Sequence, residues 1–358
     1  MLVYVGTYTI DSKSKGIYPF RLDSNTGSLT RCAKAISLTN PTFITSSANN
    51  LFAVSEVADV NGTYGGSVNT YHINKETGAL TFINSQSTQG AYPCHVALDT
   101  LEKQLAVSNY MGGNIVVYPI KENGKIGDLN DVAQHYGGSK GNTERQEGPH
   151  AHSVIFTPDN KYALVADLGK DMVLSYSLTA QGKLMSHKNG VINTELGQGP
   201  RHMEFHPNGQ FMFLLNELGN TIQSFKYHND SGVLEQVNII SSLPSDFKGD
   251  SIAADIHVHP SGKFLYASNR GQDSLVLCAI NQENGVLEVL GHQSTFGKHP
   301  RNFSIDPTGN FLLVANKDSN NIVTFKIDQD SGILSSINEN VEVTQPVCIH
   351  FLKIDNNN

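Results

Sequence analysis

The chain has 358 residues, of which 39% are hydrophobic and 16% are charged, and its formal net charge is −8. This composition excludes a disordered chain, because the apolar residues suffice for a sizeable core. An acidic surface repels nucleic acid and anionic membranes, and no run of Lys or Arg supplies a basic patch. We therefore expect neither of them as a partner.

The N-terminal segment MLVYVGTYTIDSKSK lacks the basic start and the long apolar stretch of a signal peptide. No segment is apolar over the 18 residues that suggest a membrane-spanning helix. The four cysteines, Cys32, Cys94, Cys278 and Cys348, lie far apart without a C-x-x-C pair, which favours reduced thiols over a disulfide framework. We expect a soluble cytoplasmic protein.

A turn signature, Gly-x-Leu or Gly-x-Ile, recurs seven times along the chain at intervals of 51, 46, 58, 50, 53 and 47 residues. A period near 50 with strand-like alternation on both sides of each turn is typical of a radially repeated four-stranded unit. No segment sustains the apolar pattern of a helical solenoid. The turn glycines are Gly27, Gly78, Gly124, Gly182, Gly232, Gly285 and Gly332.

Between these turns the sequence predicts β-hairpins built around a P-x-G turn. Their apolar runs are short and nearly continuous, as expected for inner strands that are packed on both faces. In chain order, weaker copies begin at Pro41 and Pro93, and clear copies begin at His152, Arg201, Asp255 and Arg301.

The seventh hairpin is divided between the two ends of the chain. QPVCIHFLKI near the C-terminus resembles an inner strand without a partner, and LVYVGTYT at the N-terminus resembles a second strand without a first. Pairing them closes a ring and removes exposed sheet edges. We therefore predict an all-β protein in which residues 1–358 form a single seven-bladed β-propeller domain.

In each blade the start of the first strand and the end of the second lie side by side, so the flanking residues should converge on one mouth of the central channel. Arg201 and Glu217 are predicted to lie directly opposite each other. The resulting ring is rich in Arg and His, which suggests a small anionic substrate. Its members are His95 with Asn109, His150 and His152 with Asp167, Arg201 and His202 with Glu217, Asp255 and His257 with Arg270, and Arg301 with Lys317.

Some of these residues have a structural alternative. The polar residue after each second strand, such as Asn109 or Asp167, can satisfy backbone groups. His206 and His259 precede the turn prolines and are expected to be structural. An ion pair between Arg201 and Glu217 could likewise be structural.

Three loops should reach the same mouth and serve as rims or lids: residues 58–66, 137–148 and 245–251. His150 and His152 could lie on one face of a strand and ligate a metal, yet spacing gives no third ligand, so we expect neither metal nor cofactor. P-loop, dinucleotide-binding, nucleophile-elbow and zinc-protease motifs are absent from the sequence.

The motifs YVGTYT, YPCHVALD, NYMGGNIVVYPI, GPHAHSVIFTPD, GPRHMEFHPNG, ASNRG and PRNFSIDPTGN occur in this order along the chain. Together they resemble the propeller lactonase family, which includes bacterial 6-phosphogluconolactonases and a fungal carboxy-muconate cyclase. The resemblance implies functional roles for His150, Arg201, Glu217 and Arg270, with His152 able to share the role of His150. SEVADV stands where an N-E pair is common in the family, which speaks against a role for Glu56.

The resemblance implies hydrolysis of 6-phosphogluconolactone to 6-phosphogluconate, a step of the pentose phosphate pathway. Glu217 or His150 would activate water, and Arg201 would face the oxyanion. Arg201 should lower the pKa of Glu217 and weaken it as a base, which favours His150. Arg270, Arg301 and Lys317 would hold the phosphate, and the other expected substrate contacts are His152, His202, Asn109 and Asp167.

Two other functions fit the same ring of residues. A carboxy-muconate cycloisomerase would use the arginines to hold carboxylates, and because both substrates are polyanions, electrostatics does not separate the two enzymes. A non-catalytic propeller would bind a protein or a small ligand, should tolerate substitution at the mouth, and should expose an apolar patch.

Overall fold

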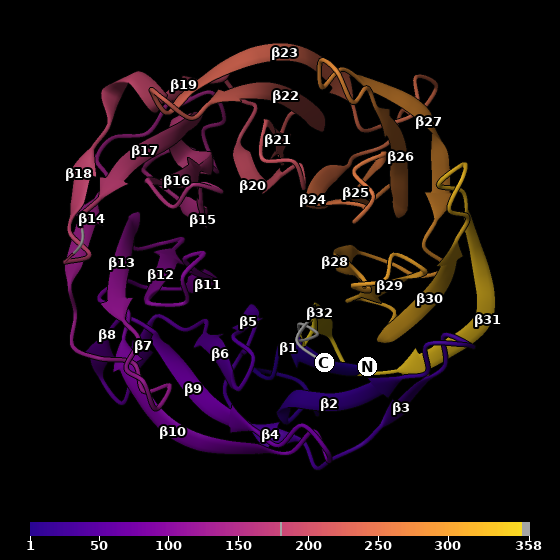
Figure 1. Ribbon diagram of the computed structural model, residues 1–358, viewed down its shortest axis with the longest axis horizontal. Helices are drawn as coiled ribbons and strands as arrows, with labels where there is room; N and C mark the ends of the chain where they lie inside the picture. The colour runs from indigo at the N-terminus through magenta and orange to yellow at the C-terminus, as the bar shows by residue number, and fades with distance from the viewer. Residues whose placement is uncertain (180, 353–358) are drawn as a thin grey trace.

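The seven predicted repeats fold into seven antiparallel sheets that stand as blades around a central axis (Figure 1). The computed structural model describes residues 1–179 and 181–352. Within these residues the helices are two single turns, η1 (Leu168–Lys170) and η2 (Lys188–Gly190), so none has the length needed to cross a membrane. The prediction of an all-β, seven-bladed propeller is confirmed.

Each blade runs from an inner first strand to an outer fourth strand. The second, third and fourth blades are β5 (Ile44–Ser46), β6 (Asn50–Ser55), β9 (Ser67–Ile73) and β10 (Leu80–Ser87); β11 (Pro93–Leu98), β12 (Gln104–Asn109), β13 (Asn114–Pro119) and β14 (Asp131–Gln134); and β15 (Ala151–Phe156), β16 (Tyr162–Asp167), β17 (Met172–Leu178) and β18 (Leu184–Ser186), with β19 (Ile192–Asn193) beside β17. A small ribbon of β7 (Asp59–Val60) and β8 (Thr63–Tyr64) follows β6.

The last three blades repeat the same order without extra strands. They are β20 (Pro200–Phe205), β21 (Phe211–Asn216), β22 (Thr221–His228) and β23 (Val233–Ser241); β24 (Ile252–Val258), β25 (Phe264–Arg270), β26 (Ser274–Ile280) and β27 (Leu287–Ser294); and β28 (Pro300–Ile305), β29 (Phe311–Asn316), β30 (Asn321–Ile327) and β31 (Leu334–Glu342).

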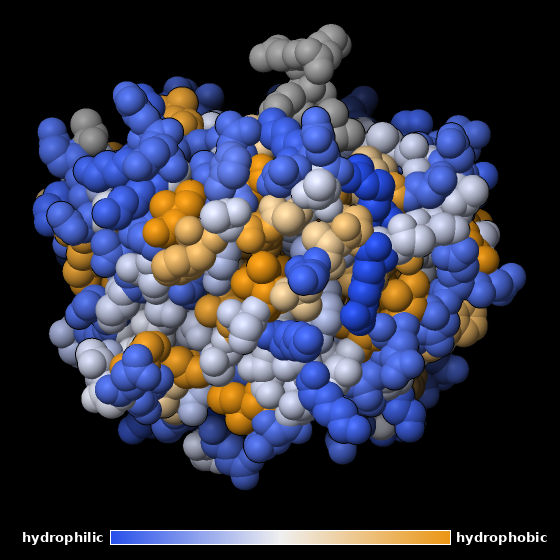
Figure 2. All heavy atoms as spheres, turned by 90° about the horizontal axis from the view of Figure 1, so that it is seen from below, coloured by the Kyte–Doolittle hydropathy of each residue, from blue (hydrophilic) through white to orange (hydrophobic). Residues whose placement is uncertain are grey.

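The hydrophobic core lies between neighbouring blades. Phe213 and Leu215 of β21, for example, pack in one cluster with Ala267 and Val276 of the next blade. Because the second strands are covered on both faces, every residue of β21, β25 and β29 is buried. The outer strands instead face solvent, and Figure 2 shows apolar side chains interspersed with polar ones on the outer wall.

The seven Gly-x-Leu/Ile turns connect the third and fourth strands of the seven blades, as the repeat predicted. Their glycines have φ between 69° and 79°, a region that disfavours side chains. The turns also pack against the preceding blade: a Cβ placed on Gly285 would approach the Phe211 ring to 2.4 Å. The repeated glycine therefore serves both the turn and the contact between blades.

The first blade joins the two ends of the chain. Its strands are β32 (Pro346–Phe351), β1 (Leu2–Thr7), β2 (Gly16–Leu22) and β3 (Leu29–Arg31), with β4 (Ile36–Ser37) beside β2. Val3 pairs with Phe351 and Val5 with Ile349, so the predicted closure is confirmed, and Figure 1 shows the two termini close together. Lys353 and Ile354, the last residues of the predicted strand, lie outside the described residues.

Deletion of residues 346–358 removes β32 and exposes one edge of β1 together with the core around Val5, Ile349 and Phe351. We expect the truncated chain to lose its cooperative unfolding transition, because an inner strand and its share of the core are missing. Thermal unfolding followed by circular dichroism against the full-length chain measures this. An unchanged melting temperature would contradict the proposed role of this closure in stability.

Candidate active site

Two repeated backbone features aim side chains at one end of the central axis. The first is a β-bulge near the start of the first strand, which occurs in six blades and turns one or two extra residues out of the ladder. In four of these blades the extra residue is Cys94, His152, Arg201 or Arg301.

The second feature is a buried polar residue at the end of the second strand, followed by a residue that faces the channel. Asn109, for example, donates from Nδ2 to the Thr88 carbonyl at 2.8 Å, and Asn316 donates in the same way to Thr295 at 3.0 Å. Asn109 and Asn316 thus satisfy backbone carbonyl groups, which is the structural alternative considered for these residues in the sequence. In five blades the residue that follows lines a cavity: Tyr8, Glu56, Tyr110, Glu217 and Arg270.

The two features together form a cavity of about 260 Å³ to which all seven blades contribute. Most of its lining groups are polar or charged. The lining residues are Tyr8, Glu56, Cys94, Tyr110, Arg145, His152, Glu217, Ile252, Arg270 and Arg301.

Glu217 is the buried carboxylate on which three arginines converge. Its Oε1 accepts from Arg145 Nη2 at 2.8 Å, and its Oε2 accepts from Arg201 Nε at 2.8 Å and lies 3.1 Å from Arg270 Nη2. Although burial alone would raise it, the charges of Arg270, Arg201 and Arg145 hold the pKa of Glu217 well below its usual range. The predicted lowering is confirmed, and Glu217 is a weak base.

The predicted register between Arg201 and Glu217 is wrong by the width of the bulge. Pro200 pairs with Asn216 and His202 with Leu215, so Arg201 occupies the bulge and Glu217 lies beyond the end of β21. The two side chains still meet. Arg201 is 2% exposed and lies outside the cavity lining. It therefore supports Glu217 from behind the cavity wall. The expectation that it faces the substrate oxyanion is wrong.

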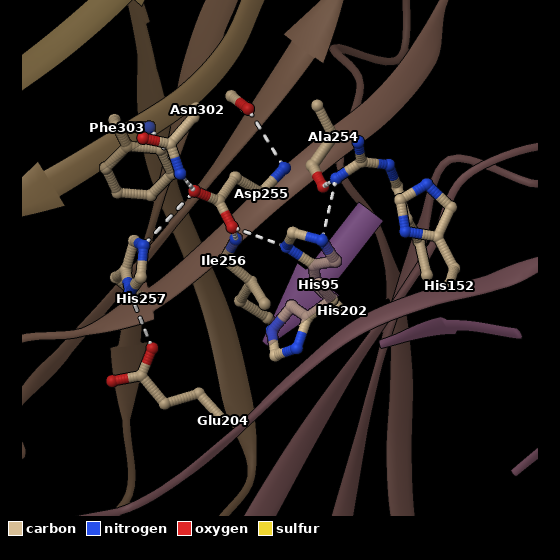
Figure 3. A network of polar contacts seen from close by, with 12 residues as sticks. His95, His152, His202, Glu204, Ala254, Asp255, Ile256, His257, Asn302 and Phe303 are labelled. Carbon is tan, nitrogen blue, oxygen red and sulfur yellow. Dashed lines mark hydrogen bonds and ion pairs between the residues drawn. The ribbon is translucent and has the colours of Figure 1, made fainter. Parts of the chain in front are cut away.

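A chain of buried polar groups holds Arg201 in place, and Figure 3 shows its members Ala254, His202 and Asp255. Arg201 Nη1 donates to the Ala254 carbonyl and, at 3.2 Å, to His202 Nε2. His202 Nδ1 in turn donates to Asp255 Oδ1 at 2.7 Å. Burial and Arg201 lower the pKa of His202 to about 4, so the ring is neutral and its Nε2 accepts the Arg201 hydrogen bond. His202 thus orients Arg201 and does not line the cavity.

The chain continues toward the opposite end of the channel. His257 lies 3.2 Å from Asp255 Oδ2 and 2.7 Å from Glu204 Oε2 (Figure 3). Although burial alone would lower it, these two carboxylates hold the pKa of His257 well above its usual value. His257 also lines a second cavity, of about 330 Å³, together with His95.

The loop of residues 137–148 carries Arg145 to the cavity, and Asp171 anchors this loop. The Asp171 carboxylate accepts from Ser139 Oγ and from Gln146 Nε2, each at 2.7 Å. It also accepts from the backbone amides of Gly197 and Gly199, which precede β20. Arg145 remains 35% exposed while it pairs with Glu217 and donates to Tyr110 Oη. This loop forms a fixed rim.

The sequence favoured His150 over His152 as the catalytic histidine of the HAH motif, but the structure places His152 at the cavity. The bulge lies at His152, which lines the cavity with its Nε2 3.8 Å from Glu217 Oε2. His150 precedes the bulge and stacks on Tyr110, with ring centroids 4.5 Å apart. Its Nδ1 lies 3.1 Å from the Tyr110 carbonyl and its Nε2 lies 3.0 Å from Glu147, so both nitrogens are engaged away from the cavity lining.

Three other predicted substrate contacts lie outside the cavity lining. Asn109 and Asp167 are buried, and Asp167 accepts hydrogen bonds from the backbone amides of His150 and Lys170. Lys317 follows Asn316 at the repeated position, but its Nζ pairs with Asp318 at 2.9 Å.

Two structural features expected from the sequence, the structural histidines and the unpaired cysteines, are in place. His206 and His259 bind the carbonyls of Gly262 and Gly309, so their predicted structural role is confirmed. All four cysteines are free thiols, and Cys32 alone is only partly buried. Within residues 1–179 and 181–352, no group of three or more His, Cys, Asp or Glu side chains is arranged to hold a metal ion.

Six lining residues, among them Ile252 at the start of β24, were not predicted from the sequence, and the repeat contained a signal for three of them. Tyr8, Glu56 and Tyr110 stand one residue past the buried polar position, as Glu217 and Arg270 do. The position itself therefore predicts cavity-facing side chains. Cys94 could be predicted to line the cavity only if the position of the bulge were known, and Arg145 only if the path of the 137–148 loop were known.

The fold and the site define a seven-bladed propeller with an arginine-rich pocket on its axis. A model of the family "Lactonase, 7-bladed beta-propeller" matches residues 2–351, and the chain belongs to this family. It is 38% identical to a 6-phosphogluconolactonase of Bacillus subtilis over 98% of this chain and 97% of the relative.

Two solved structures extend the comparison. A putative 6-phosphogluconolactonase of Bacteroides fragilis is 35% identical, with 98% of each chain covered and a TM-score of 0.90. The periplasmic gluconolactonase PpgL of Pseudomonas aeruginosa is 31% identical, with 99% of this chain and 100% of that chain covered and a TM-score of 0.92. The predicted family resemblance is confirmed.

Substitution of Glu217 by Gln should destabilise the fold by about 3–5 kcal/mol at neutral pH, because buried arginines lose their counter-charge. A carboxylate with a depressed pKa contributes stability that is present above its unfolded pKa and lost as pH falls. Stability of the natural chain should therefore decline below about pH 5, and the variant should show less of this decline. Urea unfolding at a series of pH values tests this against Glu288→Gln, an exposed glutamate of β27. Equal stabilities of the two variants would contradict the role of Glu217.

Proposed function

We propose that this protein hydrolyses a sugar lactone, with 6-phosphogluconolactone as the first candidate substrate and 6-phosphogluconate as its product. The observation that carries the proposal is an axial pocket with arginine donors left open for an anion. The relatives named 6-phosphogluconolactonase support lactone hydrolysis over the cycloisomerase.

The charges of the pocket favour an anionic ligand. Arg145, Arg270 and Arg301 line the pocket with Arg201 beneath them, against the carboxylates of Glu56 and Glu217. The Nε of Arg270 is buried and has no hydrogen-bond partner among the described residues. Polar side chains in a low-dielectric cavity bind anions strongly through charge-assisted hydrogen bonds.

Arg301 is the group best suited to the phosphate. It lines the cavity, and within the described residues its guanidinium forms no hydrogen bond or ion pair; it lies over the Tyr8 ring, 5.5 Å from the ring centroid. Planar guanidinium groups bind phosphate through two parallel hydrogen bonds. Arg301 can therefore accept a phosphate without giving up an existing partner.

Lactone opening also needs donors for the oxyanion that develops on the carbonyl oxygen. Arg270 has an unused Nε–H, and Arg145 reaches the pocket from the rim. Because Glu217 holds both guanidiniums in place, the donors are oriented before the substrate binds. His152, which burial and Arg201 keep neutral by lowering its pKa, can add a hydrogen bond to the substrate.

A second candidate substrate is an unphosphorylated gluconolactone. The solved gluconolactonase of Pseudomonas aeruginosa supports it, since that protein covers nearly the whole of this chain. The cytoplasmic location expected from the sequence favours the phosphorylated substrate, because phosphorylated sugars are membrane-impermeant, and cell fractionation would test that location.

The decisive experiment assays purified protein with 6-phosphogluconolactone and with gluconolactone, each corrected for spontaneous opening, and with a carboxy-muconate in parallel. We expect the phosphorylated lactone to give the highest kcat/KM. Arg201→Ala and Glu217→Ala should each lower it by about a hundredfold or more, because the oxyanion donors lose their support. Full activity in both variants would contradict this site.

Arg301→Ala should raise KM for 6-phosphogluconolactone by about 10- to 100-fold, as expected for loss of a charge-assisted hydrogen bond. It should leave KM for gluconolactone nearly unchanged, since that substrate has no phosphate. Arg21→Ala, which removes an exposed arginine of β2, is the matched control. Equal effects on both lactones would show that Arg301 does not bind the phosphate.

A further inference from the structure

The pocket needs a group that removes a proton from the attacking water, and the expected groups are poorly suited to this. Glu217 is held as an anion by three arginines. Burial and nearby arginines keep the pKa of His152 well below its usual value, which makes its nitrogen a weak base. His150 lies outside the cavity lining.

Glu56 lines the same cavity in a different electrostatic setting. It follows β6 in the second blade, three blades away from Glu217, and its side chain is partly buried. Its two carboxylate oxygens each accept from Tyr8 Oη at 3.3 Å. Among the described residues, no Lys, Arg or His nitrogen lies within 4.0 Å of this carboxylate. Glu56 is therefore open to the cavity and free of direct ion pairs.

Asn40 fixes Glu56 and Tyr8 relative to each other. Its Nδ2 donates to the Glu56 carbonyl at 3.1 Å, and its own carbonyl accepts from the Glu56 amide at 3.0 Å. Its Oδ1 accepts from the backbone amides of Thr9 and Ile10, at 2.8 and 3.2 Å. Asn40 is 5% exposed, so a buried side chain connects the segment after β1 with the segment after β6.

The electrostatic setting of Glu56 also suits a group that accepts a proton. Burial raises the pKa of Glu56, and Arg301 opposes this as the largest lowering influence. A carboxylate shifted upward is a stronger base than an ordinary one, and the best catalytic base has a pKa near the working pH. The charged or titratable groups that act on Glu56 from other blades are Tyr8, Cys94, Arg201 and Arg301.

We propose that Glu56, oriented by Tyr8, is the general base that activates water for lactone opening. The inference rests on the proposed lactonase function and departs from the family comparison in the sequence, which spoke against a role for Glu56. Two carboxylates of the same pocket then have different roles because their surroundings differ. Glu217 positions the arginines, and Glu56 accepts the proton from water.

The Glu56 carboxylate takes a proton from water as the water oxygen bonds to the lactone carbonyl carbon, and the carbonyl oxygen becomes an oxyanion beside the arginines. When the oxyanion collapses, the bond from this carbon to the ring oxygen breaks. The ring oxygen takes the proton back from Glu56 and becomes a hydroxyl. The new carboxylic acid then releases its own proton to solvent.

The test compares the pH dependence of kcat/KM for the natural chain, Glu56→Gln and Tyr8→Phe. We expect Glu56→Gln to lower kcat by about a hundredfold or more and to abolish the acid limb of the profile. Tyr8→Phe removes a hydrogen bond that stabilises the charged carboxylate, so it should move the acid limb to higher pH. Glu288→Gln, on outer strand β27, is the matched control and should match the natural chain.

The outcomes distinguish the two proposals. Activity of the natural chain together with near-normal kcat and an intact acid limb in Glu56→Gln overturns the role of Glu56 alone. Inactivity of the natural chain toward both lactones overturns the proposed function, and the role of Glu56 in that reaction with it.

A second measurement does not depend on turnover. Carbon-13 NMR of the glutamate carboxyl groups, with Glu56 assigned by its loss in Glu56→Gln, should show Glu56 titrating above the ordinary glutamate value of 4.5. Titration at or below this value overturns the inference, even where Glu56→Gln is inactive through misfolding.

Discussion

Antiparallel pairing of β32 with β1 closes the ring, and the site depends on this closure because every blade contributes to it. Tyr8 follows β1 directly, so the same strand that closes the fold also delivers a phenol to the pocket. A ring with one blade misplaced would separate Tyr8 from Glu56 and Arg301. Closure thus sets the distances between groups that are far apart in the sequence.

Within the ring, Glu217 balances the charges of three arginines. Leaving that many guanidiniums without a counter-charge in a buried pocket would cost several kcal/mol, and a single carboxylate shared among them reduces this cost. Sharing also leaves donors unfilled, as the unpartnered Nε of Arg270 shows. The pocket is therefore stable without a ligand and still able to bind an anion.

Arg201 has a supporting place in this arrangement. On the side away from the cavity, Arg201 donates a hydrogen bond to His202, which Asp255 holds in turn. On the cavity side, Arg201 pairs with Glu217. Because His202 is neutral, its Nε2 can accept a hydrogen bond from the guanidinium without charge repulsion. A residue that looked like a direct substrate contact in the sequence is thus a positioning residue in the structure.

The sequence by itself determined the blade number, the hairpins, the closure of the ring and the mouth on which Arg201, Glu217 and Arg270 converge. These follow from local turn chemistry and from a repeat period that each blade expresses. Only the tertiary structure decided which neighbours face the pocket. In the fourth blade, one bulge residue in β15 shifts the register and so brings His152, not His150, to the cavity. Glu56 acquires its setting from Tyr8 and Arg301 of other blades, because burial and electrostatics depend on distances that the linear sequence does not contain.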